Sequence, residues 1–530
     1  MQKTFSFKLL PAEAADTTAV KQYIAAAEGV DPAQVSGYYI VKQSIDARGK
    51  QPWVNLTVTA SVNEPFRMRE RQSFSFKEVH HSSQRVIIIG AGPAGLFAVL
   101  SLLEAGIKPI ILERGKDVRA RRRDLALLNK EGEVNPESNY CFGEGGAGTY
   151  SDGKLYTRSN KRGDINRILN LFVHFGAPDN ILYESHPHIG TNKLPHIITA
   201  MRKQLVDCGA EFLFEKKVTG LLTKNDTVKG VQTADGDTFI ADAVILATGH
   251  SARDIFDMLH MAHIKIEAKP FALGVRAEHP QVLIDIAQYH CNIRDLALPP
   301  ASYSLVQQVD GKGVFSFCMC PGGIIAPAAT SPGELVVNGW SPSKRNNPYA
   351  NSGIVVTVEE KDVVELIKKD KLKIKTDKNP LMLMQFQQHI EQKAFIAGGG
   401  KFVAPAQRLV DFAQNKQSAD LPGCSYLPGI HAMKLQQVLP AFISHRLQEG
   451  FKEYGKKMRG YFTNDAVVVA TESRTSSPVR IPRMADTLQH PQIRNLYPCG
   501  EGAGYAGGIV SAAMDGERVA ALISQLLRYG

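Results

Sequence analysis

Apolar positions follow two patterns along the chain, and these patterns predict two kinds of sheet. Residues 85–89 (RVIII) and 108–113 (KPIILE) are suited to short buried strands, and a helical segment at 94–105 lies between them. Strands that alternate with helices are typical of a parallel, doubly wound α/β sheet. From residue 270 the pattern changes to strand-like runs separated by Gly and Pro, at 271–279, 314–320, 334–339 and 353–359. We interpret these runs as an antiparallel, substrate-side sheet, followed by helices near 381–397 and 434–457.

The first 80 residues have a pattern of their own. Residues 4–10 resemble a strand, 17–28 are Ala-rich and helical, and 38–48 and 52–62 alternate like half-buried strands. This order predicts a small N-terminal βαββ module. We therefore expect four segments: the module at 1–80, a nucleotide-binding domain that begins at 81–268, an inserted antiparallel substrate domain at 269–480, and a return to the nucleotide-binding domain at 481–530.

A glycine-rich turn follows the first buried strand of the α/β region. In the G-x-G-x-x-G motif, Gly90 allows the tight turn, Gly92 lets the backbone approach a pyrophosphate, and Gly95 lets helix and strand pack closely. The pyrophosphate would lie at the N-terminus of the helix, beside Pro93 and Ala94, where free N–H groups and the helix dipole favour anions. Glu113 ends the next strand, where an acid binds the adenosine ribose. The motif predicts a dinucleotide site but does not separate FAD from NAD.

Later segments separate FAD from NAD, because their order resembles a known family of FAD-binding domains. A strand at 241–251 runs into Ala247-Thr248-Gly249, and Gly500-Glu501 precedes a Gly-rich loop and a final helix. This order resembles the FAD-binding domain of the glutathione-reductase-like flavoproteins over about 85–255 and 490–530. The resemblance implies FAD as the cofactor, a late Gly-acid pair at the ribityl chain, and the helix start at Gly507, Gly508 and Ile509 facing the flavin pyrimidine.

A second resemblance spans nearly the whole chain. Segments 141–155, 186–194, 269–280, 317–323 and 471–483 are similar to a family of bacterial FAD-dependent dehydrogenases of largely unassigned reaction. Together, motif and resemblance give this set of expected cofactor-binding residues: Gly90, Gly92, Pro93, Ala94, Gly95, Glu113, Arg114, Arg121, Gly146, Ala147, Gly148, Lys154, Val218, Ala247, Thr248, Gly249, Gly500, Glu501, Gly507, Gly508 and Ile509.

Two features of better-known relatives are missing. The stretch 143–155 contains no cysteine and hence no C-x4-C pair, which argues against disulfide reductase chemistry. No second G-x-G-x-x-G follows a strand, because the GGG at 398–400 follows a helical segment. Either an NAD(P)H donor would bind transiently against the flavin, or the electrons would arrive from elsewhere.

Three polar clusters each leave two interpretations open. Cys318 and Cys320 would place both sulfurs on one face of a strand, as a redox pair or as buried packing. His186 and His188 lack a third metal ligand nearby, so we predict structural or substrate contacts and no metal. Residues 474–477 (RTSS) would form an anion clamp beside the flavin or a surface loop.

Composition narrows the class further. Apolar residues make up 44% and charged residues 22%, as in ordinary globular proteins, and no segment has the pattern of a membrane span or secretory signal. Seven cysteines without a C-x-x-C pair indicate a reducing, cytoplasmic setting. The net charge is +10, and the basic run from Arg114 to Arg123 would form a solvated helix face or neutralise phosphate.

The sequence thus predicts an FAD-dependent oxidoreductase that transfers hydride between a small-molecule substrate and flavin N5, on the face covered by residues 270–360. The protein would supply orientation and electrostatics to the flavin. It identifies no general acid or base and does not define the oligomeric state. Two alternatives remain: a flavin-dependent RNA-modifying protein, which lacks an RNP-like aromatic motif here, and a non-catalytic FAD sensor or scaffold.

Overall fold

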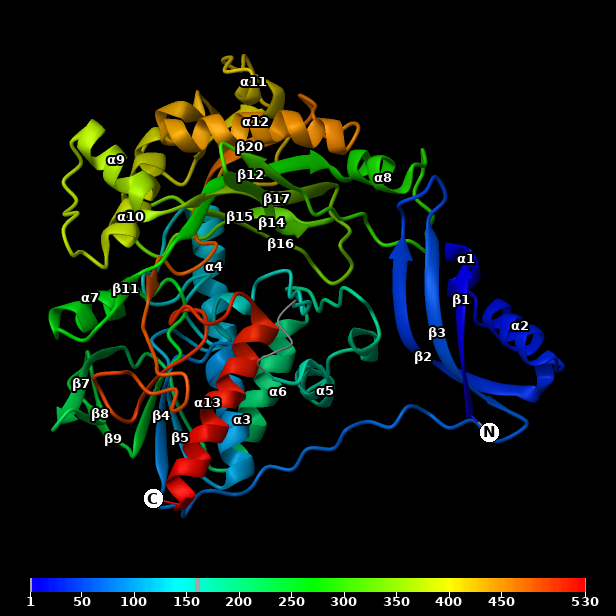
Figure 1. Ribbon diagram of the computed structural model, residues 1–530, viewed down its shortest axis with the longest axis horizontal. Coiled ribbons are helices and arrows are strands. Elements are labelled where there is room, and N and C mark those ends of the chain that lie inside the picture. Colours follow the sequence, from blue (N-terminus) through cyan, green and yellow to red (C-terminus); the bar gives the residue numbers. More distant parts are fainter. Residues whose placement is uncertain (1, 158–162, 530) are drawn as a thin grey trace.

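A computed structural model describes residues 2–157 and 163–529 (Figure 1). Its centre is a five-stranded parallel sheet in the order β22-β10-β4-β5-β6. Its strands are β4 (Arg85–Ile89), β5 (Lys108–Leu112), β6 (Glu211–Leu213), β10 (Ala243–Leu246) and β22 (Leu496–Pro498). Because β22 pairs with β10, the C-terminal segment completes a sheet that begins more than 400 residues earlier. The predicted doubly wound parallel sheet, with a return from the C-terminal end, is confirmed.

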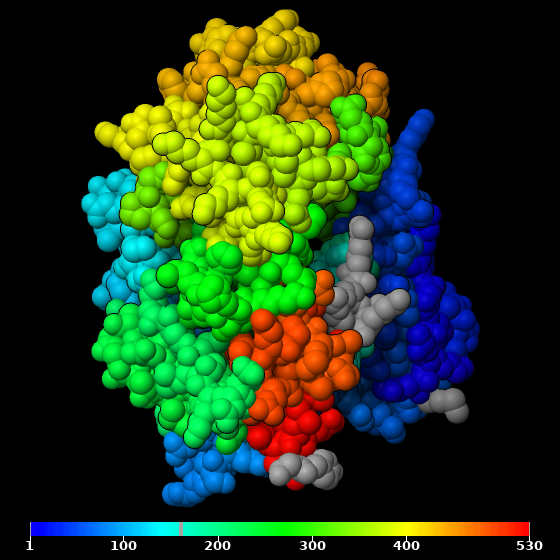
Figure 2. Space-filling model, turned by 60° about the vertical axis from the view of Figure 1, so that its left-hand side comes forward, coloured from blue at the N-terminus to red at the C-terminus, as the bar shows by residue number. Residues whose placement is uncertain are grey.

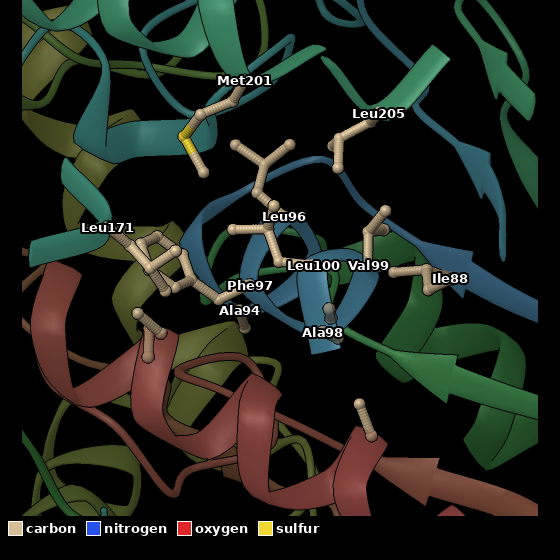
Figure 3. Packing of buried hydrophobic residues seen from close by; sticks show 14 of the residues in the cluster. Ile88, Ala94, Leu96, Phe97, Ala98, Val99, Leu100, Leu171, Met201 and Leu205 are labelled. Atoms are coloured by element: carbon tan, nitrogen blue, oxygen red, sulfur yellow. The ribbon is translucent and has the colours of Figure 1, made fainter. Parts of the chain in front are cut away.

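Helices cover one face of this sheet. They are α3 (Pro93–Ala105), α5 (Ile165–His174), α6 (Leu194–Asp207) and α13 (Ile509–Tyr529). Figure 3 shows α3 at the centre, with Met201 and Leu205 of α6 on one side and Leu171 of α5 on another. Helices α3 and α13 approach closely because Gly516 has no side chain: a Cβ there would lie 2.0 Å from the Ala94 oxygen.

The other face of the parallel sheet packs against a small antiparallel sheet and a further helix. The sheet is β7 (Val218–Lys224), β8 (Thr227–Thr233) and β9 (Thr238–Ile240), and the helix is α7 (Arg253–Met261). Helix α4 (Val118–Glu131) contacts α6 instead. Ile87, Ile89 and Ile110 contribute to the apolar cluster on this side, while Ile88 and Ile111 point into the cluster on the opposite side. Burial on both faces explains why these strands are continuous apolar runs.

The predicted inserted sheet is also present, with seven strands in the order β13-β14-β17-β12-β20-β18-β19. These strands are β12 (Phe271–Pro280), β13 (Val306–Val309), β14 (Lys312–Cys320), β17 (Tyr349–Val358), β18 (Ala404–Arg408), β19 (Ile430–Ala432) and β20 (Val467–Glu472). All neighbours are antiparallel except β18 and β19. Two-stranded ribbons adjoin it: β11 (Glu267–Ala268) with β21 (Val479–Arg480), and β15 (Ile324–Pro327) with β16 (Val337–Trp340). Its helices are α8 (Gln281–Tyr289), α9 (Glu360–Asp370), α10 (Met382–Ala397), α11 (Leu409–Ala413) and α12 (Ala441–Lys457).

The N-terminal module lies along one side of the molecule (Figures 1 and 2). It consists of β1 (Gln2–Leu9), α1 (Pro11–Ala15), α2 (Thr17–Glu28), β2 (Val35–Asp46) and β3 (Trp53–Val62), in an antiparallel sheet of order β1-β3-β2. The structure adds the short helix α1 to the predicted βαββ order. The module has its own apolar cluster, and an extended segment after residue 63 leads to β4. Short 3-10 turns complete the chain: η1 (Pro32–Gln34), η2 (Gly146–Gly148), η3 (Asp179–Leu182) and η4 (Leu435–Gln437).

Candidate cofactor site

A cavity of about 360 Å³ lies where the parallel sheet meets the antiparallel one. Ile89, Leu112 and Ala247 line it at the carboxyl ends of β4, β5 and β10. The opposite wall contains Cys318 of β14 and Asn338 of β16. Open α/β sheets bind their ligands at this edge, so the fold itself points to this cavity.

The turn between β4 and α3 shows three different uses of glycine. Gly90 has φ +103°, and a Cβ there would lie 2.5 Å from the Ala247 oxygen. A Cβ on Gly95 would lie 2.0 Å from the Gly90 oxygen, so both positions need glycine for packing. Gly92 differs: the nearest atom to its Cβ position is Gly146 Cα at 3.8 Å, and the residue faces the cavity at the N-cap of α3. The open space beside Gly92, at the N-terminus of α3, is what a pyrophosphate needs in order to approach the backbone N–H groups.

Glu113 is almost fully buried at the cavity and holds three loops together. Its Oε2 accepts a hydrogen bond from the Ala91 N–H, and its Oε1 accepts from the N–H groups of Gly115 and Gly143, each at 2.9 Å. A carboxylate has about four acceptor positions, so one remains for a ligand hydroxyl. Glu113 therefore has a structural task that the sequence motif alone did not reveal.

A further observation supports a bound polar ligand. Thr248 Oγ1 lines the cavity, is buried, and has no hydrogen-bond partner among the described residues. Buried hydroxyls without partners are rare in folded proteins. The free hydroxyl and the open face of Gly92 both fit a dinucleotide in this cavity.

Most of the sequence-predicted site residues line this one cavity. They are Gly90, Gly92, Pro93, Ala94, Glu113, Arg114, Gly146, Ala147, Gly148, Lys154, Val218, Ala247, Thr248, Gly249, Glu501, Gly507, Gly508 and Ile509. Gly95 and Gly500 lie behind the lining. The Gly500 N–H donates to Asp515 of α13, which also pairs with Arg483.

Arg121 does not line the cavity, and the expectation for it is corrected. Its side chain is fully buried, and its guanidinium donates to the carbonyls of Asn139, Tyr140, Gly143 and Glu144. It thus fixes the 139–144 loop from behind. Arg114 lines the cavity, but its guanidinium pairs with Glu137 and Asp254. The guanidinium groups of Arg114 and Arg121 are therefore already engaged and are not available to bind phosphate.

The final helix, α13, begins at Ile509, the last residue of the predicted start at 507–509. The Gly508 oxygen accepts from the Ala512 N–H, which makes Gly508 the residue that precedes α13. No atom of the described residues lies within 4 Å of the Cβ positions of Gly507 and Gly508, and both residues line the cavity. The first N–H groups of α13 have no carbonyl partners within the helix and can meet a ligand.

Comparison with known proteins identifies the family. Residues 270–475 match the model described as FAD-dependent protein, C-terminal domain-like; 193–323 match FAD dependent oxidoreductase; and 84–256 match pyridine nucleotide-disulphide oxidoreductase. Residues 1–61 match a domain of unknown function. An uncharacterized protein of Clostridium beijerinckii is 39% identical over 508 residues, covering 92% of each chain. The chain belongs to the FAD-dependent oxidoreductase family.

FAD is accordingly the cofactor of this FAD-dependent oxidoreductase. Solved structures that align with most of this chain include a flavin-dependent brominase (TM-score 0.36, 14% identity, 84% of this chain and 79% of that one). Another is glycine oxidase from Bacillus cereus (TM-score 0.29, 14% identity, 84% and 96%). These similarities are too low to indicate a reaction. The family matches favour neither the RNA-modifying alternative nor the sensor alternative.

The 474–477 loop of this oxidoreductase is buried, so the surface-loop interpretation is wrong. Arg474 lines the FAD cavity but pairs with Glu391 at 2.7 Å and with Glu334 at 3.2 Å. Burial raises the pKa of Glu391, but Arg253 and Arg474 outweigh it and lower that pKa to about 2. Because its charge is already compensated, Arg474 is not a free anion clamp either; it ties the loop to α10.

Sequence reasoning missed Asp152, which lies in the loop after η2 and lines the FAD cavity. Its carboxylate is buried and pairs with Arg345 at 2.7 Å, while Oδ1 has no partner among the described residues. Burial raises the pKa of Asp152, but Lys154 and Arg345 outweigh it and hold the pKa below its ordinary value. Asp152 lies in a stretch already singled out by resemblance, yet only the tertiary contact with Arg345 reveals its role.

A second, larger cavity adjoins this region. It has a volume of about 1760 Å³ and is lined by parts of the N-terminal module, 184–188, 286–305, 343–346 and 456–460. Its charged lining residues are Arg48, Arg294, Lys344, Arg345, Lys456, Lys457 and Arg459, against Asp46 and Glu184. Arg345 pairs with Asp152 of the FAD cavity, and the His186 ring lies 4.8 Å from that of Tyr156, which lines the FAD cavity. The two cavities therefore share a wall.

His186 and His188 both line the larger cavity. No group of three or more potential metal ligands occurs among the described residues. Burial lowers the pKa of His188 to about 4, so its ring is neutral at physiological pH. Within residues 2–157 and 163–529, no helix has the length and apolar character needed to cross a bilayer.

Proposed function

We propose that this protein transfers hydride between a small-molecule substrate and N5 of its FAD. The bound flavin would supply the redox chemistry, and the chain would bind and orient both partners. The observation that carries the proposal is the composition of the FAD cavity: the nucleotide-binding turn forms one end, and Phe317, Cys318 and Asn338 of the antiparallel region form a wall. A substrate would lie against that wall.

Within this proposal each part of the cavity has a distinct task. Gly92 and the first N–H groups of α3 would bind the pyrophosphate, and the remaining acceptor position of Glu113 would bind the adenosine ribose. Gly507, Gly508 and Ile509 would lie at the flavin pyrimidine, where the helix dipole favours negative charge on reduced flavin. We also propose that the four segments of the chain act as separate domains and that the protein is cytoplasmic, since all seven cysteines are free.

We further propose that the substrate is anionic. The larger cavity adjoins the FAD cavity, and three of its cationic lining residues, Lys344, Lys457 and Arg459, have no acidic partner among the described residues. A cavity lined by one sign of charge raises the local concentration of the opposite charge. NADH or NADPH would act as a transient donor, because the described residues form only one parallel nucleotide-binding sheet.

Anaerobic reduction of the purified protein tests the proposal. NADH, NADPH and fractionated metabolite pools, neutral and anionic, are mixed with the oxidised protein, and the flavin absorption is followed. Bleaching by an anionic pool, reversed by oxygen, is the expected result. If every pool leaves the flavin oxidised while dithionite still bleaches it, the hydride-transfer proposal fails. Cofactor released by heat should have the mass of FAD.

A further inference from the structure

Strand β14 is distorted where it reaches the FAD cavity. Its pairing with β17 shifts register between Phe317 and Cys320, and Cys318 has φ +47°. A positive φ is uncommon for a residue with a side chain, costs free energy, and clusters at functional sites. The distortion puts Cys318 on the cavity wall, while Cys320 is fully buried behind it.

The two cysteines differ in their expected protonation. The Cys320 thiol donates to the Cys318 backbone oxygen at 3.2 Å. The neighbouring Cys320 side chain, and then the cations Lys154 and Arg276, hold the pKa of Cys318 well below its ordinary value although burial raises it. The neighbouring Cys318 side chain, together with burial, raises the pKa of Cys320. Cys318 is thus the thiolate of the pair, and Cys320 keeps the proton.

Two cations surround these sulfurs. Lys154 Nζ lies 3.8 Å from Cys318 Sγ and 4.0 Å from Cys320 Sγ, and it also donates to the Met319 oxygen. Arg276 is fully buried, and its Nη2 lies 3.5 Å from Cys320 Sγ and 2.7 Å from the Cys318 oxygen. Glu472 compensates Arg276 at 2.7 Å, and Asp152 lies 4.0 Å from Lys154. Nearby cations stabilise a thiolate, which is the reactive form of cysteine.

We propose that Cys318 and Cys320 form a redox dithiol that exchanges two electrons with the bound FAD. When the Sγ–Sγ bond forms, the pair loses two electrons and the proton of Cys320; the FAD accepts both, and its reduced form carries the negative charge that Cys318 gives up. The reverse reaction breaks the bond and restores the thiolate and the thiol. The pair lies on the antiparallel sheet and not in the 143–155 stretch, where disulfide reductases carry their C-x4-C.

Backbone geometry allows this closure. A regular strand would separate the Cα atoms of residues i and i+2 by about 6.6 Å, close to the upper limit for a disulfide. The register shift and the left-handed conformation of Cys318 show that the backbone between these two cysteines is not a regular extended strand. A short, strained disulfide is readily reduced, which suits a redox pair and not a structural crosslink.

Electron counting on the whole protein tests this proposal without any substrate. Ferricyanide-oxidised, desalted protein is titrated anaerobically with dithionite. The wild type should take up about four electrons per FAD, two for the flavin and two for the disulfide. Cys318→Ser and Cys320→Ser should each take up about two. Cys424→Ser, which removes a part-buried cysteine outside both cavities, should still take up about four.

Alkylation of the unfolded chain gives an independent count. Denatured in iodoacetamide, the reduced wild type should gain seven labels and the oxidised form five, because two of the seven cysteines would be joined. These measurements on the wild type remain decisive if a variant fails to fold. Uptake of two electrons with seven labels in the oxidised protein would overturn the proposal. The proposal rests on FAD as cofactor and not on hydride transfer, so each fails separately.

Discussion

At the residue scale, the glycines of the Gly90–Gly95 turn are not equivalent. Gly90 and Gly95 are required for packing, because added Cβ atoms would meet backbone at 2.5 and 2.0 Å. Gly92 has room for a side chain, but that room is the cavity itself. A substitution at Gly92 therefore tests ligand binding with little disturbance of the fold.

We expect Gly92→Val to abolish FAD binding and leave the folded apoprotein intact. The isopropyl group would fill the space into which a pyrophosphate must approach, and we expect affinity to fall by about 100-fold or more, or at least ~2.7 kcal/mol. FAD content after gel filtration and circular dichroism of the apoprotein measure the two effects. Gly49→Val, at an exposed turn with no atom within 4 Å of its Cβ position, is the matched control and should retain FAD.

Glu113→Ala should behave differently, because this carboxylate holds three loops. Removing it leaves the buried N–H groups of Ala91, Gly115 and Gly143 without acceptors, at a cost of about 1–3 kcal/mol each. We expect a lower melting temperature of the apoprotein as well as weaker FAD binding. Weakened binding with an unchanged apoprotein melting temperature would contradict the structural task assigned to Glu113.

Residue identities in the turn could be predicted from the sequence because backbone geometry there is local. The roles of Arg121 and Arg474 could not, because they depend on partners distant in the chain. Arg121 satisfies carbonyls of the 139–144 loop, and Arg474 neutralises Glu391 of α10. The local pattern of a basic run or a polar loop does not reveal which distant residues its side chains will contact.

At the scale of elements, strands β4 and β5 of the parallel sheet were predicted closely because both their faces are buried and their apolar runs are continuous. The start of α13 was predicted only as the stretch 507–509, since glycine gives no side-chain cap to mark the boundary, and the helix begins at Ile509. The distortion of β14 was also beyond prediction: a regular strand pattern hides a left-handed residue at Cys318.

The N-terminus of α13 leads to a prediction about flavin redox potential. Gly508→Leu would place a side chain in the open space before Ile509 and move the flavin away from the free N–H groups. Those groups carry about half a positive charge, which favours anionic reduced flavin. We expect a lower midpoint potential, or no flavin binding, with a smaller effect in Gly508→Ala. Full FAD binding with an unchanged potential in a redox titration would contradict this placement of the helix.

Helix α13 is also tied to α5 by a half-buried ion pair whose strength depends on pH. Glu517 of α13 pairs with Arg167 of α5 at 3.0 Å. Burial raises the pKa of Glu517 from 4.5 to about 7 despite this arginine. Between these values the unfolded chain has lost a proton that the folded protein keeps, so stability falls as pH rises from 4.5 through 7.

Glu517→Gln should remove this loss, because an amide does not ionise. Relative to the wild type, we expect the melting temperature of the variant to increase between about pH 4.5 and about pH 8, with a relative gain of about 2 °C or more. Thermal unfolding followed by circular dichroism across this range measures the difference. Parallel melting curves at every pH would exclude Glu517 as the titrating group.

At the scale of the whole molecule, the N-terminal module contributes to the larger cavity and not to the FAD cavity. Gln43–Arg48, Val54 and Asn55 line the former, and none of the described residues before Ile89 lines the latter. The module is held by backbone hydrogen bonds between Gln43 and the 183–185 segment. Its position follows from contacts with sequence 140 residues away, which explains why the sequence predicted the module but not its place.

Because the two cavities share a wall, a substrate could reach the FAD cavity through the larger one. Changing cationic residues of the larger cavity tests whether its positive charge attracts that substrate. Lys344 and Arg459 are exposed, line the larger cavity, and do not line the FAD cavity. In the double variant Lys344→Glu/Arg459→Glu, an anionic pool that reduces the wild-type flavin should show a KM raised about tenfold or more, since ~1.4 kcal/mol of lost attraction is tenfold. FAD content should stay unchanged.

Lys368→Glu, which changes an exposed lysine of α9 outside both cavities, is the matched control. High salt should narrow the difference between wild type and double variant because it screens exposed charges. A double variant with the KM of the wild type at low salt would show that the substrate does not approach through this cavity.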